Sequence, residues 1–341
     1  MPFADVIGHN QPKKLMQAAI SNNRLAHAYL FHGEDRIGKR LLAIRVAQAL
    51  LCDVVTHPAD GCGICRSCVQ IESRTHPDFS VIHPDPEQTT PQIKIEQIRD
   101  LEQQIIYRPL IGDRKICVID DADRLTIGAA NALLKTLEEP PDHSLFLVVS
   151  SRAFALPATI RSRCQALRFA APAQTQIEAA VILRRNLPPA DARFLAILSE
   201  GRIGEALDSD VDAMKSRQHE YSTLLAPSAL RSISILLNTA ETLSKTDRAG
   251  EALAWLQRWL RDILTVSMGG TIDHALDLDR REAFAALSET VHIDALIDLL
   301  EEIDRLQGQS ARNLNLQIAL ENVLIRFRDL FSSSADALPR R

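Results

Sequence analysis

The sequence predicts an α/β core with a mainly parallel sheet and flanking helices, followed by a small all-α lid and an all-α C-terminal domain. In the first half, short apolar segments alternate with segments whose apolar residues recur at helical spacing. This pattern is typical of a sheet covered by helices on both faces. After about residue 170 only the helical spacing remains. Aromatic residues make up 4% of the chain, which favours helices with aliphatic cores over an all-β fold.

The strands and helices of the first half alternate along the chain. Runs of apolar residues too short for a helix predict strands, and apolar residues three and four positions apart predict helices. The last of these helices ends before Pro140 and Pro141, because proline cannot continue a helix. The expected strands are 28–31, 79–82, 115–119 and 145–149, and the expected helices are 11–21, 39–51, 95–105 and 127–137.

The second half divides into a small helical unit and a larger one. A linker of small residues at 170–173 precedes helical spacing over 174–207, which is interrupted by Pro188 and Pro189. Amphipathic helices follow from 211, for example at 252–264 and 293–306, and the tail 332–341 is polar. We therefore expect domains at 1–170, 171–210 and 211–341, in keeping with roughly 150 residues per domain and a length of 341.

The composition excludes several classes of protein. The net charge is −5, so the chain does not coat nucleic acid through bulk positive charge. Hydrophobic residues at 46% and charged residues at 24% are typical of globular domains. No apolar run approaches the roughly 18 residues that span a bilayer, and the first ten residues lack a secretory signal pattern. We expect a cytoplasmic protein without a membrane partner.

A phosphate-binding loop is expected between the first strand and the helix that follows it. The segment Gly33 to Lys39 matches the pattern of two glycines and a lysine in which backbone N–H groups cradle a phosphate. Lys39 would reach the β- and γ-phosphates. Gly38 is followed by Lys39 and then by Arg40, where a Ser or Thr would normally ligate Mg²⁺. The alternative is a glycine-rich turn without a ligand.

Two aspartates complete the expected nucleotide site. Asp120 and Asp121 follow the apolar strand 115–119. Asp120 would hold Mg²⁺, and Asp121 stands where many ATPases carry a glutamate that polarises the attacking water. The alternative is that both carboxylates only cap the helix that follows.

Four cysteines at 52, 62, 65 and 68 predict a metal site. Two intervening residues allow neighbouring thiolates to bind one tetrahedral ion, and four thiolates leave no open position, as in structural zinc sites. The alternatives are reduced buried cysteines or disulfides, with His57 and His76 as possible substitute ligands. Cys117 lies in a predicted core strand and is interpreted as a small apolar residue.

Several motifs together carry a family resemblance. Residues 24–28 precede the phosphate loop, and the four-cysteine insertion at 52–68 follows its helix. The segments 120–123, 130–141 and 160–164 then read Asp-Asp-Ala-Asp, Ala-Asn-Ala-Leu-Leu-Lys-Thr-Leu-Glu-Glu-Pro-Pro and Ile-Arg-Ser-Arg-Cys. The chain resembles the bacterial clamp-loader branch of the AAA+ proteins. The resemblance covers residues 5 to about 170 and is weaker at 201–207 and 313–324.

The resemblance implies an AAA+ core, a helical lid and a helical collar that builds a five-subunit ring. The partners would be clamp-loader motor subunits and a delta subunit, and the ring would load a sliding clamp onto primed DNA. The resemblance also implies that Arg163 is an arginine finger, which reaches ATP bound by the neighbouring subunit and stabilises charge during phosphoryl transfer. From spacing alone, Arg163 would be a surface arginine beside a buried Cys164.

Departures from the motor subunits indicate a stator that does not hydrolyse ATP. Arg40 replaces the hydroxyl that ligates Mg²⁺, so binding of ATP with Mg²⁺ at this site is doubtful. Gly204 stands where the lid motif carries an arginine, and Arg202 is out of register by two. Ser150 or Ser151 could be a residual γ-phosphate sensor. The alternatives are an active AAA+ ATPase and a zinc-containing nucleic-acid-binding module.

Overall fold

The structure is a computed structural model of the chain and describes residues 2–54, 59–85, 90–230, 232–246, 248–270, 291–309 and 315–332. It divides into two compact units, Met1–Ser209 and Asp210–Arg341. The core and the lid, which we expected as separate domains, therefore lie within one unit. The possible ligand His57 and most of the polar tail lie outside the described residues.

A five-stranded parallel sheet forms the centre of the first unit. Its strands are β1 (Ala28–His32), β2 (Phe79–Ile82), β3 (Lys115–Ile119), β4 (Ser144–Ser150) and β5 (Gln165–Arg168). Their order is β2-β3-β4-β1-β5, and every pair is parallel. The parallel sheet and the first four strands confirm the expectation. The sequence analysis missed β5, because in this edge strand only Leu167 is buried.

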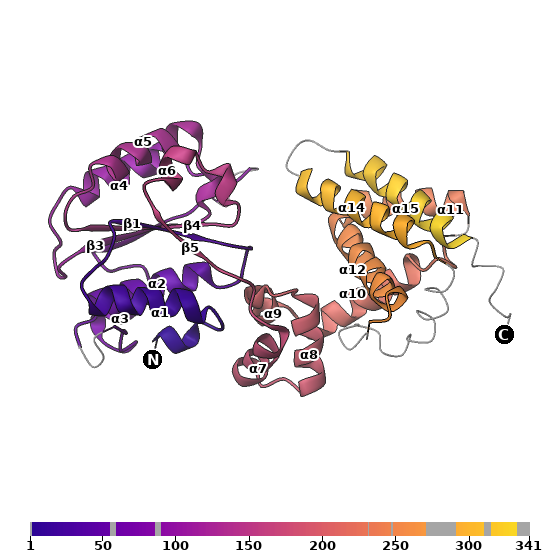
Figure 1. Ribbon diagram of the computed structural model, residues 1–341, viewed down its shortest axis with the longest axis horizontal. Coiled ribbons are helices and arrows are strands. Elements are labelled where there is room, and N and C mark those ends of the chain that lie inside the picture. Colours follow the sequence, from indigo (N-terminus) through magenta and orange to yellow (C-terminus); the bar gives the residue numbers. More distant parts are fainter. Residues whose placement is uncertain are drawn as a thin grey trace. The chain divides into compact units, whose positions relative to one another are not determined.

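Helices cover both faces of the sheet (Figure 1). One face carries α1 (Asn10–Ser21), α2 (Lys39–Leu51) and α3 (Arg66–Glu72), and the other carries α4 (Ile95–Ile105), α5 (Ile127–Glu138) and α6 (Ala158–Arg161). Successive side chains of a strand point to opposite faces. In β1, Tyr29 and Phe31 belong to the apolar core beneath α1 and α2, whereas Ala28 and Leu30 belong to the core beneath α4 and α5. This is why each strand is apolar at consecutive positions.

The predicted lid consists of α7 (Gln174–Arg185), α8 (Pro189–Leu198) and α9 (Ile203–Asp208). Pro189 is the first residue of α8, a position where the missing N–H group of proline costs nothing. Gly201 has a φ of +93°, and a Cβ atom there would lie 2.5 Å from the Cβ atom of Ala171. A glycine is therefore required where the lid passes the linker that follows the sheet.

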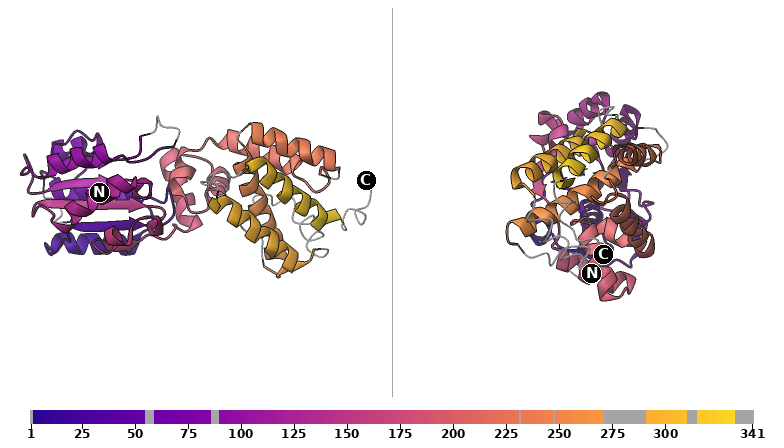
Figure 2. Two further views of the ribbon diagram at one scale, coloured as in Figure 1. Left: turned by 90° about the horizontal axis from the view of Figure 1, so that it is seen from above. Right: turned by 90° about the vertical axis from the view of Figure 1, so that its right-hand side faces the viewer.

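The second unit is helical in the part of the chain that the structure describes (Figure 2). Its helices are α10 (Val211–Leu224), α11 (Ile233–Lys245), α12 (Ala249–Ser267), α14 (Ile293–Gln309) and α15 (Leu316–Ser332). Trp259, Phe327 and Phe331 pack together with ring centroids 5.1 to 5.2 Å apart. Across both units, no helix among the described residues has the length and apolar character to cross a bilayer.

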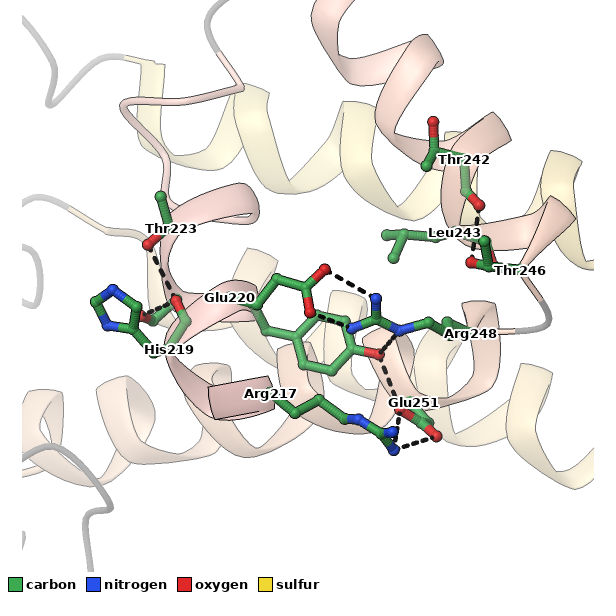
Figure 3. A network of polar contacts seen from close by, with 11 residues as sticks. Arg217, His219, Glu220, Thr223, Thr242, Leu243, Thr246, Arg248 and Glu251 are labelled. Carbon is green, nitrogen blue, oxygen red and sulfur yellow. Dashed lines mark hydrogen bonds and ion pairs between the residues drawn. The ribbon is translucent and has the colours of Figure 1, made fainter. Parts of the chain in front are cut away.

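A network of polar contacts joins α10 to the start of α12 (Figure 3). The guanidinium of Arg248 donates to both carboxylate oxygens of Glu220, at 2.8 and 2.7 Å, and lies 5.0 Å from the centre of the Tyr221 ring. The Tyr221 hydroxyl donates to Glu251 at 3.0 Å, and Arg217 donates to the same carboxylate. Because the Tyr221 side chain is buried, its hydroxyl depends on these partners.

Replacing Tyr221 with Phe removes the hydroxyl and should destabilise the second unit by about 1 kcal/mol. Both tryptophans of the chain, Trp255 and Trp259, lie in α12, so tryptophan fluorescence during urea unfolding reports on this unit alone. Lys245→Gln is the control, because its pair with Glu241 is an exposed contact within α11, and it should leave the midpoint unchanged. Equal midpoints for Tyr221→Phe and the wild type would contradict the role of the network.

Candidate nucleotide site, subunit interface and metal centre

The phosphate loop connects β1 to α2, as the sequence predicts. Gly33 has a φ of +153°, and a Cβ atom there would lie 2.3 Å from the carbonyl oxygen of Phe169. Gly38 has a φ of +107° and caps the start of α2. Both positions therefore need glycine. The loop brings backbone N–H groups to a helix N-terminus, the arrangement that favours phosphate.

Lys39 is buried in this loop and is bonded to the loop itself. Its ammonium donates to the carbonyl oxygen of Gly33 at 3.0 Å and to that of Glu34. Burial lowers the pKa of Lys39, whereas the carboxylates of Asp35, Asp121 and Asp120 oppose this shift. Lys39 thus lies in the expected place, with its charge balanced by nearby carboxylates.

Arg40 and Asp120 form an ion pair within the site. A guanidinium nitrogen of Arg40 lies 3.2 Å from a carboxylate oxygen of Asp120, whose side chain is 13% exposed. Burial raises the pKa of Asp120, and Arg40 opposes that shift. The pKa of Asp121 is also raised, first by burial and then by the charge of Asp120. The cation that compensates Asp120 is therefore a side chain of the same protein.

A pocket of about 450 Å³ lies between the phosphate loop and the lid. It brings together the predicted residues Gly38, Lys39, Arg40, Asp120, Asp121 and Gly204, with Arg36, Arg184 and Asp208 among the residues that the sequence analysis did not identify. Gly33 does not line the pocket but shapes the loop at its base. The lining alternates between cations and carboxylates, so the pocket is not a simple anion site.

The lid contacts the phosphate loop directly. The N–H group of Gly204 donates to the carbonyl oxygen of Arg36 at 2.9 Å, and Arg36 forms an ion pair with Asp208 at the end of α9. A Cβ atom at position 204 would lie 3.2 Å from the Arg36 carbonyl oxygen. Arg202 pairs with Glu205 at 3.3 Å and does not line the pocket. The lid therefore meets the loop through its backbone at the place where the family motif carries an arginine.

The serines at the end of β4 do not face the pocket. The hydroxyl of Ser150 donates to Asp123 at 2.9 Å, and the N–H group of Ser151 donates to the same oxygen at 3.2 Å. Arg152 forms an ion pair with that carboxylate at 3.0 Å. Burial opposes ionisation of Asp123, but these contacts lower its pKa. The geometry does not support a phosphate-sensing role for either serine.

Arg163 lies in the turn between α6 and β5. Its guanidinium donates to Glu138 at 2.6 Å and to the carbonyl oxygen of Thr159 at 3.0 Å, and its side chain is 35% exposed. Burial raises the pKa of the adjacent Cys164 thiol to about 11. The sequence analysis did not identify Glu138, although it belongs to the Leu-Glu-Glu-Pro motif at the end of α5.

The four predicted cysteine ligands come together. The sulfur atoms of Cys52, Cys62, Cys65 and Cys68 all lie within 4.8 Å of one another, and those of Cys52 and Cys65 are 3.8 Å apart. Ligands about 2.3 Å from a tetrahedral zinc ion would lie about 3.8 Å from each other. None of the four is in a disulfide. The cluster could hold a metal ion.

The thiols of the cluster lie in different surroundings. The N–H groups of Ile64 and Cys65 lower the pKa of Cys62 to about 6, whereas burial raises the pKa of Cys68. His76 lies outside the cluster, and its Nδ1 atom accepts the N–H group of Asp78 at 3.1 Å. Cys117 is fully buried in β3, which raises its pKa to about 12 and confirms its apolar role.

Comparisons with known proteins identify the family. Residues 8–173 match the family model described as DNA polymerase III, delta subunit, and residues 212–329 match the model of its C-terminal part. The chain belongs to the clamp-loader family of DNA polymerase III subunits. The parallel sheet with flanking helices, followed by helical units, is the fold class that the resemblance implied.

Individual relatives extend the match over the whole chain. The delta' subunit of Bacillus subtilis is 28% identical over 347 residues, covering 94% of this chain and 96% of that protein. The delta' subunit of Pseudomonas aeruginosa is 38% identical over 169 residues, which is 49% of this chain and 50% of that protein. The tau/gamma subunit of Haemophilus influenzae is 29% identical over 98% of this chain, but the chain spans only 46% of that protein.

The Arg40–Asp120 pair generates a prediction about stability and pH. Arg40→Ala removes the cation that lowers the pKa of Asp120, so this pKa moves further above its value in the unfolded chain. A carboxyl group with a raised folded pKa costs stability above that pKa, and the cost disappears as the pH falls. We therefore expect a loss of about 1 kcal/mol at pH 8, where solvent partly screens the pair, and a smaller loss at pH 5.

Calorimetric unfolding of the full chain at the two pH values measures this difference. Arg40→Ala combined with Asp120→Asn is the matched control, because it removes both charges and should recover most of the stability at pH 8. An Arg40→Ala variant that loses the same stability at pH 5 as at pH 8 would show that Asp120 is not the partner that matters.

Proposed function

We propose that the chain is the delta-prime stator of the bacterial clamp loader in the DNA polymerase III holoenzyme. In this role it joins clamp-loader motor subunits and a delta subunit in a five-subunit ring, which loads the sliding clamp onto primed DNA in the cytoplasm. One contrast carries the proposal. The chain's own nucleotide site is neutralised by the Arg40–Asp120 pair, whereas Arg163 remains at the surface of the unit.

The ion pair argues against ATP hydrolysis by this chain. In ATPases of this kind Mg²⁺ is held by a loop hydroxyl and by the aspartate after a strand. Here the hydroxyl is absent, and Asp120 is compensated by Arg40 at 3.2 Å. To bind Asp120, Mg²⁺ with ATP would have to displace the Arg40 guanidinium, which already lies 3.2 Å from that carboxylate. The site therefore favours a subunit that does not hydrolyse ATP. It argues against an active ATPase or a remodelling enzyme.

Arg163 fits the role of an arginine finger toward the neighbouring subunit. A guanidinium next to a γ-phosphate stabilises the charge that develops during phosphoryl transfer. Glu138 and the Thr159 carbonyl group hold Arg163 in place while leaving it accessible. Glu138 would act as a positioning residue, which keeps the side chain ordered until a phosphate competes for it.

The second unit would be the collar. On α11 the side chains of Ile233, Ile235 and Leu237 are exposed, although this helix also contributes Leu236, Ala240 and Leu243 to the core. Apolar side chains on more than one face of a helix are expected where the helix also packs against another subunit. This supports an oligomerisation role for the unit.

The cysteine cluster would hold a structural zinc ion. Its four sulfur donors at these separations fit zinc and leave no position for a substrate. The module packs on α2, since the Gln48 amide donates to the Cys68 carbonyl oxygen at 3.0 Å, and a Cβ atom at Gly61 would lie 2.9 Å from that of Gln48. A zinc-containing nucleic-acid-binding module is the weaker candidate, because the net charge of −5 gives the chain no bulk positive charge for binding nucleic acid.

Arg163→Ala should reduce the primed-DNA-stimulated ATP hydrolysis of a reconstituted clamp loader by ten-fold or more, because the neighbouring site loses its charge stabilisation. The measurement uses the assembled ring with its sliding clamp. Glu138→Gln should have a smaller effect on the rate, since the finger is intact but less ordered. Its main effect should be an increase in the ATP concentration needed for half-maximal rate.

Lys14→Ala is the control for this experiment, because Lys14 is exposed on α1, on the opposite face of the sheet from α6 (Figure 1). It should leave the rate unchanged. The isolated wild-type chain should show no Mg²⁺-dependent turnover. An unchanged rate for Arg163→Ala with assembly intact would contradict the finger, and DNA-stimulated turnover by the isolated chain would contradict the stator.

Metal analysis of the purified chain should find about one zinc ion per chain and none after Cys65 and Cys68 are both replaced with Ser. Loss of zinc should increase hydrogen exchange in α3 and in residues 59–68 much more than in α12, because a structural metal contributes folding energy where it binds. The proposed site would be contradicted if the purified wild-type chain contained no zinc and its residues 59–68 exchanged hydrogen at the same rate as those of the Cys65 and Cys68 variant. Cys117→Ser is the control, since Cys117 is remote from the cluster in sequence and lies in β3.

A further inference from the structure

An exposed aromatic side chain lies close to the proposed finger. Phe154 belongs to the short 3-10 helix Ala153–Ala155 that follows β4, and it is 90% exposed. The guanidinium carbon of Arg161 lies 5.1 Å from the centre of the Phe154 ring. Arg161 is the last residue of α6 and precedes Arg163 by two positions. The aromatic ring therefore contacts the last residue of the short helix that leads to the finger.

The backbone that carries Phe154 is held in place on both sides. Before it, the Asp123 carboxylate binds Ser150, Ser151 and Arg152. After it, the side chain of Leu156 is buried in the core between the sheet and α5. A side chain on an ordered backbone loses little conformational freedom when it binds a partner. Asp123 thus serves to fix the segment that presents Phe154.

Arg161 lacks an acidic partner within the part of the chain that the structure describes. Its contact with Phe154 is a cation–π interaction, and its Nε atom is buried without a hydrogen-bond acceptor. Arg163, by contrast, is paired with Glu138 at 2.6 Å. A half-buried arginine without an acidic partner among the described residues, next to an exposed aromatic ring, is suited to binding a carboxylate of another protein.

We propose that Phe154 and Arg161 form an anchoring contact with the neighbouring ATPase subunit of the ring, namely the subunit that receives Arg163. This inference rests on the proposed function. The partner surface would be an apolar recess for the Phe154 ring, bordered by a carboxylate that binds Arg161. Because α6 carries Arg161 and leads directly to Arg163, a subunit that contacts the finger must also meet this pair.

The anchor would have a consequence for the finger. Burial of the pair in an interface strengthens the cation–π interaction, because the guanidinium loses competing water. Aromatic and arginine side chains are also the types that dominate the binding energy of many interfaces. Binding of Phe154 and Arg161 would then fix α6 against the neighbour and limit the positions that Arg163 can adopt.

The test measures the affinity of the full chain for the purified motor subunit, together with DNA-stimulated ATP hydrolysis by the assembled ring. Phe154→Ala should weaken association by about ten-fold, and Arg161→Gln by about three-fold or more. At concentrations that saturate assembly, both variants should retain more ATP hydrolysis than Arg163→Ala. Thermal unfolding of each variant should match the wild type, since neither change removes a core side chain.

Leu183→Ala is the matched control, because Leu183 is 84% exposed on α7 and has no part in the proposed contact. Affinities of Phe154→Ala and Arg161→Gln within two-fold of the wild type would overturn the anchor, even where Arg163→Ala abolishes hydrolysis and the proposed function stands. A normal rate for Arg163→Ala together with weak binding by Phe154→Ala would overturn the finger and support the anchor as an interface. Absence of any association by the wild-type chain would overturn both.

Discussion

The Arg40–Asp120 ion pair determines what the nucleotide site of this protein can do. The carboxylate of Asp120 is mostly buried and directly follows β3, whose last four residues are buried and apolar, so it needs a cation nearby. In an active ATPase a magnesium ion would supply that charge only when nucleotide is bound. Here Arg40 supplies it permanently. In the proposed function, the carboxylate of Asp120 is thus compensated without a bound magnesium ion.

At the other side of the pocket, the lid is also bonded to the protein itself. Gly204 brings the backbone of α9 to within hydrogen-bonding distance of the Arg36 carbonyl oxygen, and Arg36 itself is paired with Asp208. At the end of β4, Asp123 binds the serine hydroxyl group that could otherwise face a phosphate. Each element that would sense nucleotide is therefore bonded to the protein instead. Together these contacts support a rigid first unit.

The sequence predicted the parts of the structure that depend on local pattern. The first four strands, the phosphate loop and the convergence of Cys52, Cys62, Cys65 and Cys68 follow from apolar runs, glycine positions and cysteine spacing. The pattern could not predict β5, because an edge strand with one buried residue lacks a sheet signal. Nor could it predict the partners of Arg36 and Arg163, since Asp208 and Glu138 are brought close only by tertiary packing. The contact between Ser150 and Asp123 was also not predictable from local pattern.

The separation of the two sites is compatible with the proposed function, in which the chain does not hydrolyse ATP but supplies a finger. Arg40 acts through Asp120 at the carboxyl ends of the strands, whereas Arg163 is held by α5 and α6 through Glu138 and Thr159. No contact of Arg163 involves a residue that lines the pocket. A substitution at position 40 therefore leaves the geometry of Arg163 unchanged. Under the proposed function, a charge within the fold fixes the chain's own site while an adjacent surface serves the site of a neighbour.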